Sequence, residues 1–212
     1  MPLASGRVLS HTLPNSLRPD LGALKARLAE TGTSYQQDRE KLVMFSGLRT
    51  ASQMQGFRRG TIVEWSGSSK TEAVVQVLRE HPQARVAWLE ETFTLYPPAL
   101  LQHQAGLKRI LFVETGNQTL WSLLQVLRSS LFDFIVVLGG RTFHSLNDSD
   151  FRKIQMATEK SGGLVFLLNP SRSETVQANS FAISVRIKAK NIRIPNTNEK
   201  KMFLTVTKKG GA

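Results

Sequence analysis

The chain has 212 residues, of which 41% are apolar and 21% charged, and it carries a formal net charge of +12. This length and composition predict a globular protein with a substantial core and exclude a mainly disordered or collagenous chain. The absence of cysteine excludes disulfides, thiolate nucleophiles and cysteine-ligated zinc. No apolar run approaches the roughly 20 residues of a membrane helix. We therefore expect a soluble, cytoplasmic protein without a membrane partner.

The positive charge is concentrated at the two ends of the chain. Residues 1–60 have a net charge of +5, residues 61–150 of −2 and residues 151–212 of +9. Basic ends can contact nucleic acid or an acidic protein, and they are also often solvated surfaces.

Residues 1–55 are predicted to be an N-terminal segment separate from the core at 56–212. After a leader without periodicity, Leu21, Leu24 and Leu28 recur at helical spacing. They predict a short amphipathic helix near residues 20–31, whose apolar side would contact the core or a partner protein. Residues 33–60 are expected to be a connector rich in Ser, Gln and Gly.

From residue 60 onward, strands and helices are predicted to alternate. The strands are expected at 61–65, 84–89, 109–114, 133–138 and 163–168, and the helices at about 71–81, 97–106, 119–128 and 148–161. This order is typical of an α/β fold with a mostly parallel sheet flanked by helices. Residues 181–188 and 202–207 alternate apolar and polar side chains around a turn at 196–198, which predicts a C-terminal antiparallel hairpin.

The loop after the first strand has features of a phosphate-binding loop. Its residues are Gly67, Ser68, Ser69, Lys70 and Thr71, and they precede a predicted helix. The full pattern is G-x-x-x-x-G-K-[ST], whereas here the only glycine lies three residues before the lysine and Ser69 replaces the second glycine. The same residues also suit a serine-rich helix start, with Ser68 or Ser69 as the N-cap.

Residues 55–209 resemble the bacterial RecA recombinase core in the order of their segments and in the local amino-acid sequence of several of them. Gly60-Thr61-Ile62-Val63-Glu64 is similar to the entry to its phosphate loop, and Ala87-Trp88-Leu89-Glu90-Glu91 to its second strand. The resemblance places Glu91 at the position of the glutamate that positions water for ATP hydrolysis. Residues 165–169 resemble the strand before a DNA-binding loop, and 184–187 with 204–209 resemble the closing hairpin. A RecA-like core with a C-terminal antiparallel hairpin is therefore implied.

The chain departs from the RecA pattern at several positions that serve ATP. The phosphate loop is short, the fourth strand ends in Leu138-Gly139-Gly140 where an acidic residue would hold Mg²⁺, and Pro170 follows Asn169 where the family has glutamine. The segments that correspond to the DNA-binding loops, at 145–149 and 171–178, are reduced. We expect no enzymatic activity, no cofactor and no bound metal, although weak nucleotide binding at residues 67–71 stays open.

A RecA-like core without ATP machinery resembles two proteins of the DNA-damage (SOS) response. One is ImuA, an accessory protein of a translesion mutasome, and the other is SulA, which inhibits the division protein FtsZ. The length, the N-terminal helix and the basic C-terminal part favour ImuA. The resemblance implies RecA or a polymerase subunit such as ImuB as the partner, with FtsZ as the SulA-like alternative.

The basic residues of the C-terminal part form the main electrostatic feature. They are Arg186, Lys188, Lys190, Arg193, Lys200, Lys201, Lys208 and Lys209. A dense set of cations suits phosphate contacts, while single-strand readers usually add exposed aromatic residues and only Phe203 lies near. Contact with DNA and contact with a protein partner therefore both stay open.

Other candidate residues favour structural roles. Glu90 and Glu91 are adjacent on a strand and should point to opposite faces, so they are not expected to form a catalytic pair. The four histidines show no metal-ligand spacing. Trp65, Trp88 and Trp121 are expected to pack in the core.

Two readings of the function follow from these observations. The first is a non-catalytic RecA-like adaptor in damage-induced translesion synthesis. The second is an active, divergent P-loop ATPase that acts on DNA, with Lys70, Thr71 and Glu91 in working roles.

Overall fold

The computed structural model describes residues 42–51, 54–103, 105–140, 146–169, 182–193 and 200–209. These residues belong to one compact unit. The expected helix at 20–31 with Leu21, Leu24 and Leu28, the expected turn at 196–198 and the reduced segment at 171–178 lie outside the described residues. The side chains of residues 49–51 and 207–209 also lie outside the description.

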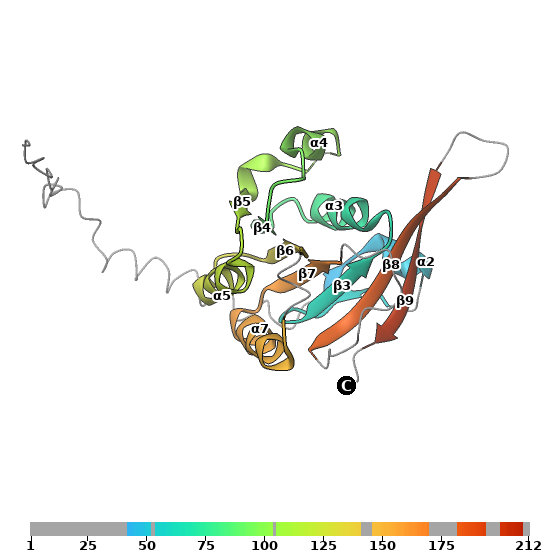
Figure 1. The fold of residues 1–212 in the computed structure, drawn as a ribbon. Helices are drawn as coiled ribbons and strands as arrows, with labels where there is room; N and C mark the ends of the chain where they lie inside the picture. Colours follow the sequence, from blue (N-terminus) through green and yellow to red (C-terminus); the bar gives the residue numbers. More distant parts are fainter. Residues whose placement is uncertain are drawn as a thin grey trace, which may run out of the picture. The chain divides into compact units, whose positions relative to one another are not determined.

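The fold is built on a seven-stranded sheet with the order β5-β4-β6-β7-β3-β8-β9 (Figure 1). All neighbouring strands pair in parallel except β8 and β9, which pair antiparallel. The α/β class, the mostly parallel sheet and the C-terminal antiparallel pair are thereby confirmed. The strands are β3 (Ile62–Ser66), β4 (Val86–Glu90), β5 (Ile110–Glu114), β6 (Phe134–Leu138), β7 (Leu164–Leu168), β8 (Ile183–Arg193) and β9 (Lys200–Lys209).

Helices cover both faces of the sheet, which explains why the central strands are apolar along their whole length. All five residues of β4 and of β7 are buried. On one face, α3 (Lys70–Glu80) and α4 (Pro97–Gln102) pack on the core, with a 3₁₀ turn at Leu107–Arg109 leading into β5. On the other face lie α5 (Thr119–Ser129) and α7 (Asp148–Ser161). Figure 1 shows these two layers.

The boundaries of α7 match the sequence prediction because both of its ends carry strong local signals. Asn147 is the N-cap and forms a capping box with Asp150. Gly162 ends the helix in the left-handed conformation, at φ 71°. By contrast α4 ends at Gln102 and is shorter than predicted.

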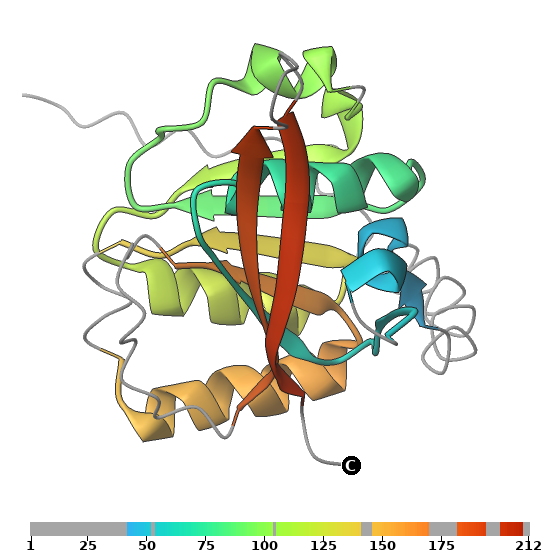
Figure 2. The same cartoon turned by 90° about the vertical axis from the view of Figure 1, so that its right-hand side faces the viewer.

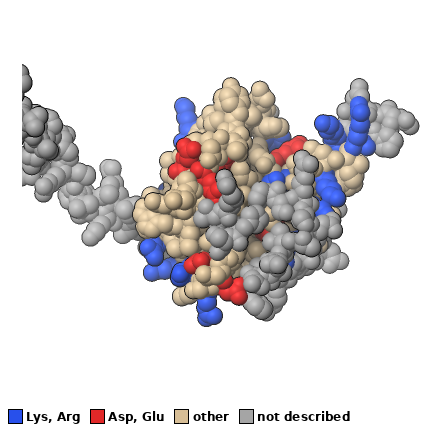
Figure 3. Space-filling model, viewed as in Figure 1, with Lys and Arg blue, Asp and Glu red and all other residues tan. Residues whose placement is uncertain are grey.

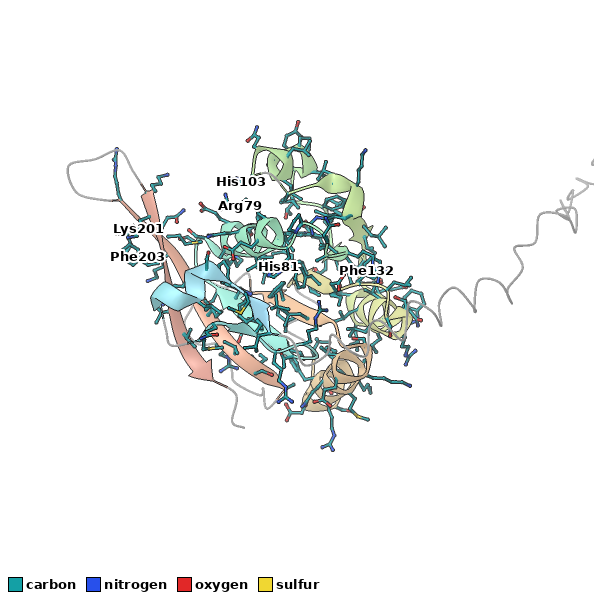
Figure 4. The ribbon with its side chains drawn as sticks, turned by 180° about the vertical axis from the view of Figure 1, so that it is seen from behind. Arg79, His81, His103, Phe132, Lys201 and Phe203 are labelled. Atoms are coloured by element: carbon teal, nitrogen blue, oxygen red, sulfur yellow. The ribbon has the colours of Figure 1, made fainter. Side chains whose placement is uncertain are left out.

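Residues 43–57 contribute side chains to the core, whereas the sequence predicts a connector at 33–60. The short strands β1 (Val43–Met44) and β2 (Gly56–Phe57) pair antiparallel, and α2 (Ser46–Ala51) lies between them. The side chains of Phe45 and Phe57 are buried. His81 at the end of α3 places its Nε2 2.7 Å from the Met44 carbonyl oxygen (Figure 4).

An aromatic cluster joins this segment to the sheet. The ring centroids of Phe45 and Phe57 lie 6.1 and 6.0 Å from that of Trp65 on β3, and the centroid of Phe166 on β7 lies 5.8 Å from that of Phe57. Several of these pairs meet edge to face, the arrangement that aromatic quadrupoles prefer. Trp65 is fully buried, and its indole Nε1 has no hydrogen-bond partner among the described residues.

The C-terminal hairpin is longer than predicted and crosses the end of the sheet (Figure 2). β8 runs from Ile183 to Arg193, and its register against β3 pairs Lys188 with Ser66. β8 therefore continues past the carboxyl end of β3, and β9 lies on its outer side. One face of the pair, which includes Ile187, Ala189 and Leu204, packs on the core.

Substitution of Phe57 with alanine tests whether residues 43–57 belong to the core. Phe57 is 1% exposed and contacts three aromatic rings, so its truncation should lower the free energy of unfolding by about 3–5 kcal/mol. Urea denaturation followed by tryptophan fluorescence measures the change. Phe93→Ala, at a side chain that is 45% exposed, is the matched control and should change stability by less than about 1 kcal/mol. Equal effects of the two substitutions would contradict this assignment.

Candidate functional site

The carboxyl ends of the parallel strands meet at one edge of the sheet, where open α/β folds usually bind ligands. β4, β6 and β7 end in register at Glu90, Leu138 and Leu168. The candidate phosphate loop follows the end of β3 at the same edge. The candidate phosphate loop and Glu91 therefore both lie at the carboxyl edge of the sheet.

The loop at Gly67–Ser69 packs directly against the backbone of β8. The Ser69 N–H donates to the Ala189 carbonyl oxygen at 3.2 Å, and the Ser69 side chain is buried. Gly67 has φ +91°, and a Cβ added there would lie 2.2 Å from the same carbonyl oxygen. The Ser69 N–H therefore points into the fold toward β8. At Gly67 the backbone of the loop comes close to the same carbonyl oxygen of β8.

The first turn of α3, which contains Lys70 and Thr71, also carries its own negative charge. Glu72 lies in this turn, and its Oε2 accepts a hydrogen bond from Asn191 Nδ2 on β8 at 2.6 Å. A carboxylate is favourable at the positive end of a helix dipole, and it competes there with any other anion. Ser69 is the N-cap residue of α3, one of the two serines that the sequence offers for this position, although its side chain forms no capping hydrogen bond with the described residues.

Glu91, which the sequence resemblance places at the position of a catalytic glutamate, lies against Gly140, two residues after the end of β6. A Cβ added to Gly140 would be 2.2 Å from the Glu91 Cδ and Oε2 atoms. The Gly139 N–H donates to the Leu168 carbonyl oxygen, which continues the pairing of β6 with β7. Glycine at 140 is therefore the residue that leaves room for the Glu91 carboxyl group. The end of β6 itself contributes no acidic side chain.

Glu90, its neighbour, organises the segment that follows β4. It is 1% exposed, and its Oε1 accepts from Trp88 Nε1 at 2.7 Å. Its Oε2 accepts from the N–H and hydroxyl groups of Thr94 and from the N–H of Leu95, at 2.5–3.3 Å. Because the buried carboxylate accepts four hydrogen bonds, its role is structural. The expectation that Glu90 and Glu91 do not form a working pair agrees with these separate environments.

A second buried carboxylate ties β3 to β7 and β8. Glu64 Oε2 lies 2.7 Å from Arg186 Nε, and Glu64 Oε1 accepts from Asn169 Nδ2 at 3.0 Å. Arg186, one of the eight candidate binding cations, is therefore engaged within the fold, and its side chain is 21% exposed.

The other candidate cations differ in their exposure along the hairpin. Lys190, Arg193, Lys200 and Lys201 are exposed, and Lys188 is half-buried. Lys208 and Lys209 belong to the backbone of β9, and their side chains lie outside the description. Figure 3 shows the blue cations gathered toward the free end of the hairpin.

An uncharged exposed stretch lies at the same edge of the sheet as Glu91. Residues 92–107 contain no Lys, Arg, Asp or Glu. Phe93, Tyr96 and Leu101 in this stretch are 45%, 68% and 56% exposed. It forms the tan surface around α4 in Figure 3. The sequence shows its lack of charge, but its exposure becomes visible only in the structure.

The tryptophan prediction is right for two residues and wrong for the third. Trp65 and Trp88 are buried, whereas Trp121 on α5 is 60% exposed. The apolar side of α5 is formed by Leu123 and Leu127 instead, two and six residues further on, and this leaves Trp121 on another side of the helix.

The described residues contain no group of three or more His, Asp or Glu side chains that could hold a metal ion. Two of the four histidines, His81 and His103, are described, and Figure 4 shows them on separate parts of the fold. None of the helices within the described ranges is long and apolar enough to span a membrane.

Arg109 lies at the opposite edge of the sheet, where β4 and β5 begin. Its guanidinium donates to the carbonyl oxygens of Leu78 and Ala84 at 2.5 and 2.7 Å and so joins the end of α3 to the start of β4. Burial lowers the pKa of Arg109, and the nearby Asp133 carboxylate opposes this effect.

Comparison with known proteins identifies the fold. No family model matches the chain, and no curated protein matches it in sequence. Among solved structures, the chain is similar to a crystal structure titled as that of the RadB recombinase. The TM-score is 0.55 and the identity 16%, over 71% of this chain and 83% of that chain. The chain therefore has a RecA-like fold, which confirms the fold that the sequence resemblance implies. The finer resemblance to ImuA or SulA stays a prediction.

Replacement of Gly67 with alanine tests the packing of the loop against β8. The added Cβ meets the Ala189 carbonyl oxygen, and φ +91° is unfavourable for an L side chain, so we expect a loss of roughly 2 kcal/mol or more in stability. Thermal unfolding measures it. Gly106→Ala, where no atom of the other described residues lies within 4 Å of the added Cβ apart from the chain neighbours, is the control and should leave the melting temperature nearly unchanged. A Gly67→Ala variant as stable as the parent would mean that the loop does not adopt this conformation.

Replacement of Glu90 with glutamine tests its structural role. The amide keeps one acceptor oxygen and turns an N–H₂ group toward existing donors, so we expect a loss of about 1–3 kcal/mol in the free energy of unfolding. Chemical denaturation provides the measurement. Glu114→Gln, at an exposed carboxylate on the end of β5, should have little effect. If Glu90→Gln proved as stable as the control, the hydrogen-bond network would not be intact in solution.

Proposed function

We propose that the chain is a non-catalytic RecA-like accessory protein of the SOS DNA-damage response. In this role it binds RecA, an error-prone polymerase complex, or both, and supports translesion synthesis. The RecA-like fold and the resemblance of residues 55–209 in sequence order are the basis for placing it among proteins that act beside RecA.

The observation that carries the non-catalytic part of the proposal is the contact between the loop after β3 and β8. A phosphate-binding loop works by turning several backbone N–H groups toward the phosphates. Here the Ser69 N–H donates to the Ala189 carbonyl oxygen, and Gly67 approaches that oxygen as well. A carbonyl oxygen in this place would repel a phosphate oxygen. The donors of this loop therefore fit a nucleoside triphosphate poorly.

The acidic residues nearby support the same proposal. A triphosphate site needs a carboxylate that helps to hold Mg²⁺ between the phosphates. The end of β6 carries Leu138 and two glycines, and Glu91 lies against Gly140. Glu72 adds negative charge at the start of α3, where the phosphates would lie.

An ATPase measurement separates this proposal from an active P-loop enzyme. We expect the purified full chain to show no Mg²⁺-dependent ATP hydrolysis above background, with or without single-stranded DNA. The Lys70→Ala variant should behave as the parent does. DNA-stimulated hydrolysis that disappears in Lys70→Ala would overturn the non-catalytic assignment, because that lysine would then contact the phosphates.

Direct binding to purified candidates tests the partner class. Biolayer interferometry with the immobilised full chain should show saturable binding to RecA or to an ImuB-type polymerase subunit, and no binding to FtsZ. Binding to FtsZ alone, together with cell filamentation on expression, would replace the proposal with division inhibition. Absence of binding to both RecA and the polymerase subunit would reject the accessory role.

A further inference from the structure

The β8–β9 hairpin has one face that packs on the core and one that does not. Ala189 and Ile187 on β8 and Leu204 on β9 belong to the packed face. Because side chains alternate along a strand, Lys190 and Phe203 lie on the opposite face. On this face the antiparallel register places Lys190 directly across from Phe203.

The outer face of the hairpin repeats a pairing of one cation with one large apolar side chain. Lys190 lies across from Phe203, and Ile192 across from Lys201. Directly opposite residues have Cβ atoms about 5 Å apart, and residues two apart on a strand are separated by about 7 Å. Phe203 is 46% exposed and Ile192 49% exposed. Figure 4 shows Lys201 and Phe203 close together on β9.

The two described strands of the hairpin carry charge of one sign, and one acidic residue, Glu199, lies between them in the sequence. The described strands at 183–193 and 200–209 contain no Asp or Glu. At the last printed pair of the hairpin, Arg193 lies across from Lys200, and both add to the positive charge around Lys190 and Lys201. This surface therefore complements an extended anion that also offers flat apolar groups.

We propose that the face formed by Lys190, Lys201 and Phe203 binds single-stranded nucleic acid. The two ammonium groups contact backbone phosphates, and one base stacks on the Phe203 ring. Unpaired bases present their ring faces, whereas a duplex conceals them within the stack, so the exposed ring favours a single strand. The lysines carry no information on base identity, and binding is independent of sequence.

This surface is distinct from the candidate phosphate loop, and the proposal goes beyond the binding of protein partners. Of the eight candidate cations, the proposal assigns phosphate contacts to Lys190 and Lys201. Arg186 forms its ion pair with Glu64 and has no part in it.

Fluorescence anisotropy with a labelled 20-mer of thymidylate tests the proposal. In 50 mM salt the full chain should bind this oligomer more tightly than a duplex of equal length. Phe203→Ala should raise the Kd about 5- to 150-fold, the range for the loss of one stacked base, and leave the salt dependence unchanged. Phe203→Trp should keep the affinity of the parent, because it retains an aromatic ring for stacking. Phe203→Leu has no such ring and should bind as weakly as Phe203→Ala.

The lysines should act through salt dependence. In the double variant Lys190→Gln, Lys201→Gln, the slope of log K against log salt concentration should fall by roughly 1.4, since each phosphate contact on a single strand contributes about 0.7. Lys108→Gln and Trp121→Ala replace an exposed cation and an exposed aromatic residue elsewhere, and they should bind as the parent does. Circular dichroism confirms that each variant is folded.

Several results would overturn the proposal. These are a lack of oligomer binding at 50 mM salt, equal or tighter binding of the duplex, or hairpin variants that behave as the two controls do. An RNA 20-mer in the same assay should bind within a few-fold of its DNA counterpart, because stacking and phosphate contacts are common to both; strong discrimination would point to a different site. Loss of RecA or polymerase binding in Phe203→Ala, without loss of oligomer binding, would assign this face to a protein.

Discussion

The parallel pairing of β8 with β3 is the constraint on which the rest of this structure depends. It places the Ala189 carbonyl oxygen over the loop after β3, where it accepts the Ser69 N–H. The same pairing brings Arg186 to Glu64 and Asn191 to Glu72. Because β8 continues beyond the end of β3, it also supports β9 and holds the hairpin at the end of the sheet. β8 therefore has two roles: it packs against the loop after β3, and it forms part of the basic surface of the hairpin.

The chain has a RecA-like fold, and two carboxylates near the carboxyl edge of its sheet are engaged within the protein. Glu90 accepts hydrogen bonds within the segment after β4, and Glu91 lies against Gly140. Both carboxylates thus contact the protein itself at the edge where this kind of sheet usually meets a ligand. The surfaces that extend from the core are instead the uncharged segment around α4 and the basic hairpin. This distribution is one reason for the proposal that the chain acts by binding other macromolecules.

The sequence predicts the regular part of the fold well because its signals are local. The apolar runs of β4 and β7 and the capping residues of α7 determine their elements without reference to the remainder of the chain. Residues 43–57 are harder to assign, since their core contacts depend on rings that are distant in sequence, such as Phe166.

The candidate site is predicted less completely. Gly67 signals a turn in the sequence, but its partner Ala189 is an ordinary small residue of an alternating strand and gives no sequence signal. Likewise Arg186 cannot be distinguished from its neighbouring cations until Glu64 is placed beside it. Trp121 is predicted to pack in the core because it belongs to a helix with an apolar side, but it lies on another side of that helix and is 60% exposed.

β9 forms the outer edge of the described sheet, and it pairs on one side only among the described strands. A strand in this position offers a row of backbone donors and acceptors to any other chain. Lysines at both of its ends oppose such association, because two copies that approached edge to edge would bring like charges together. The positive charge of the hairpin therefore opposes edge-to-edge pairing of two copies. A polyanion or high salt concentration that neutralises this charge would make the edge of one molecule available to the edge of another.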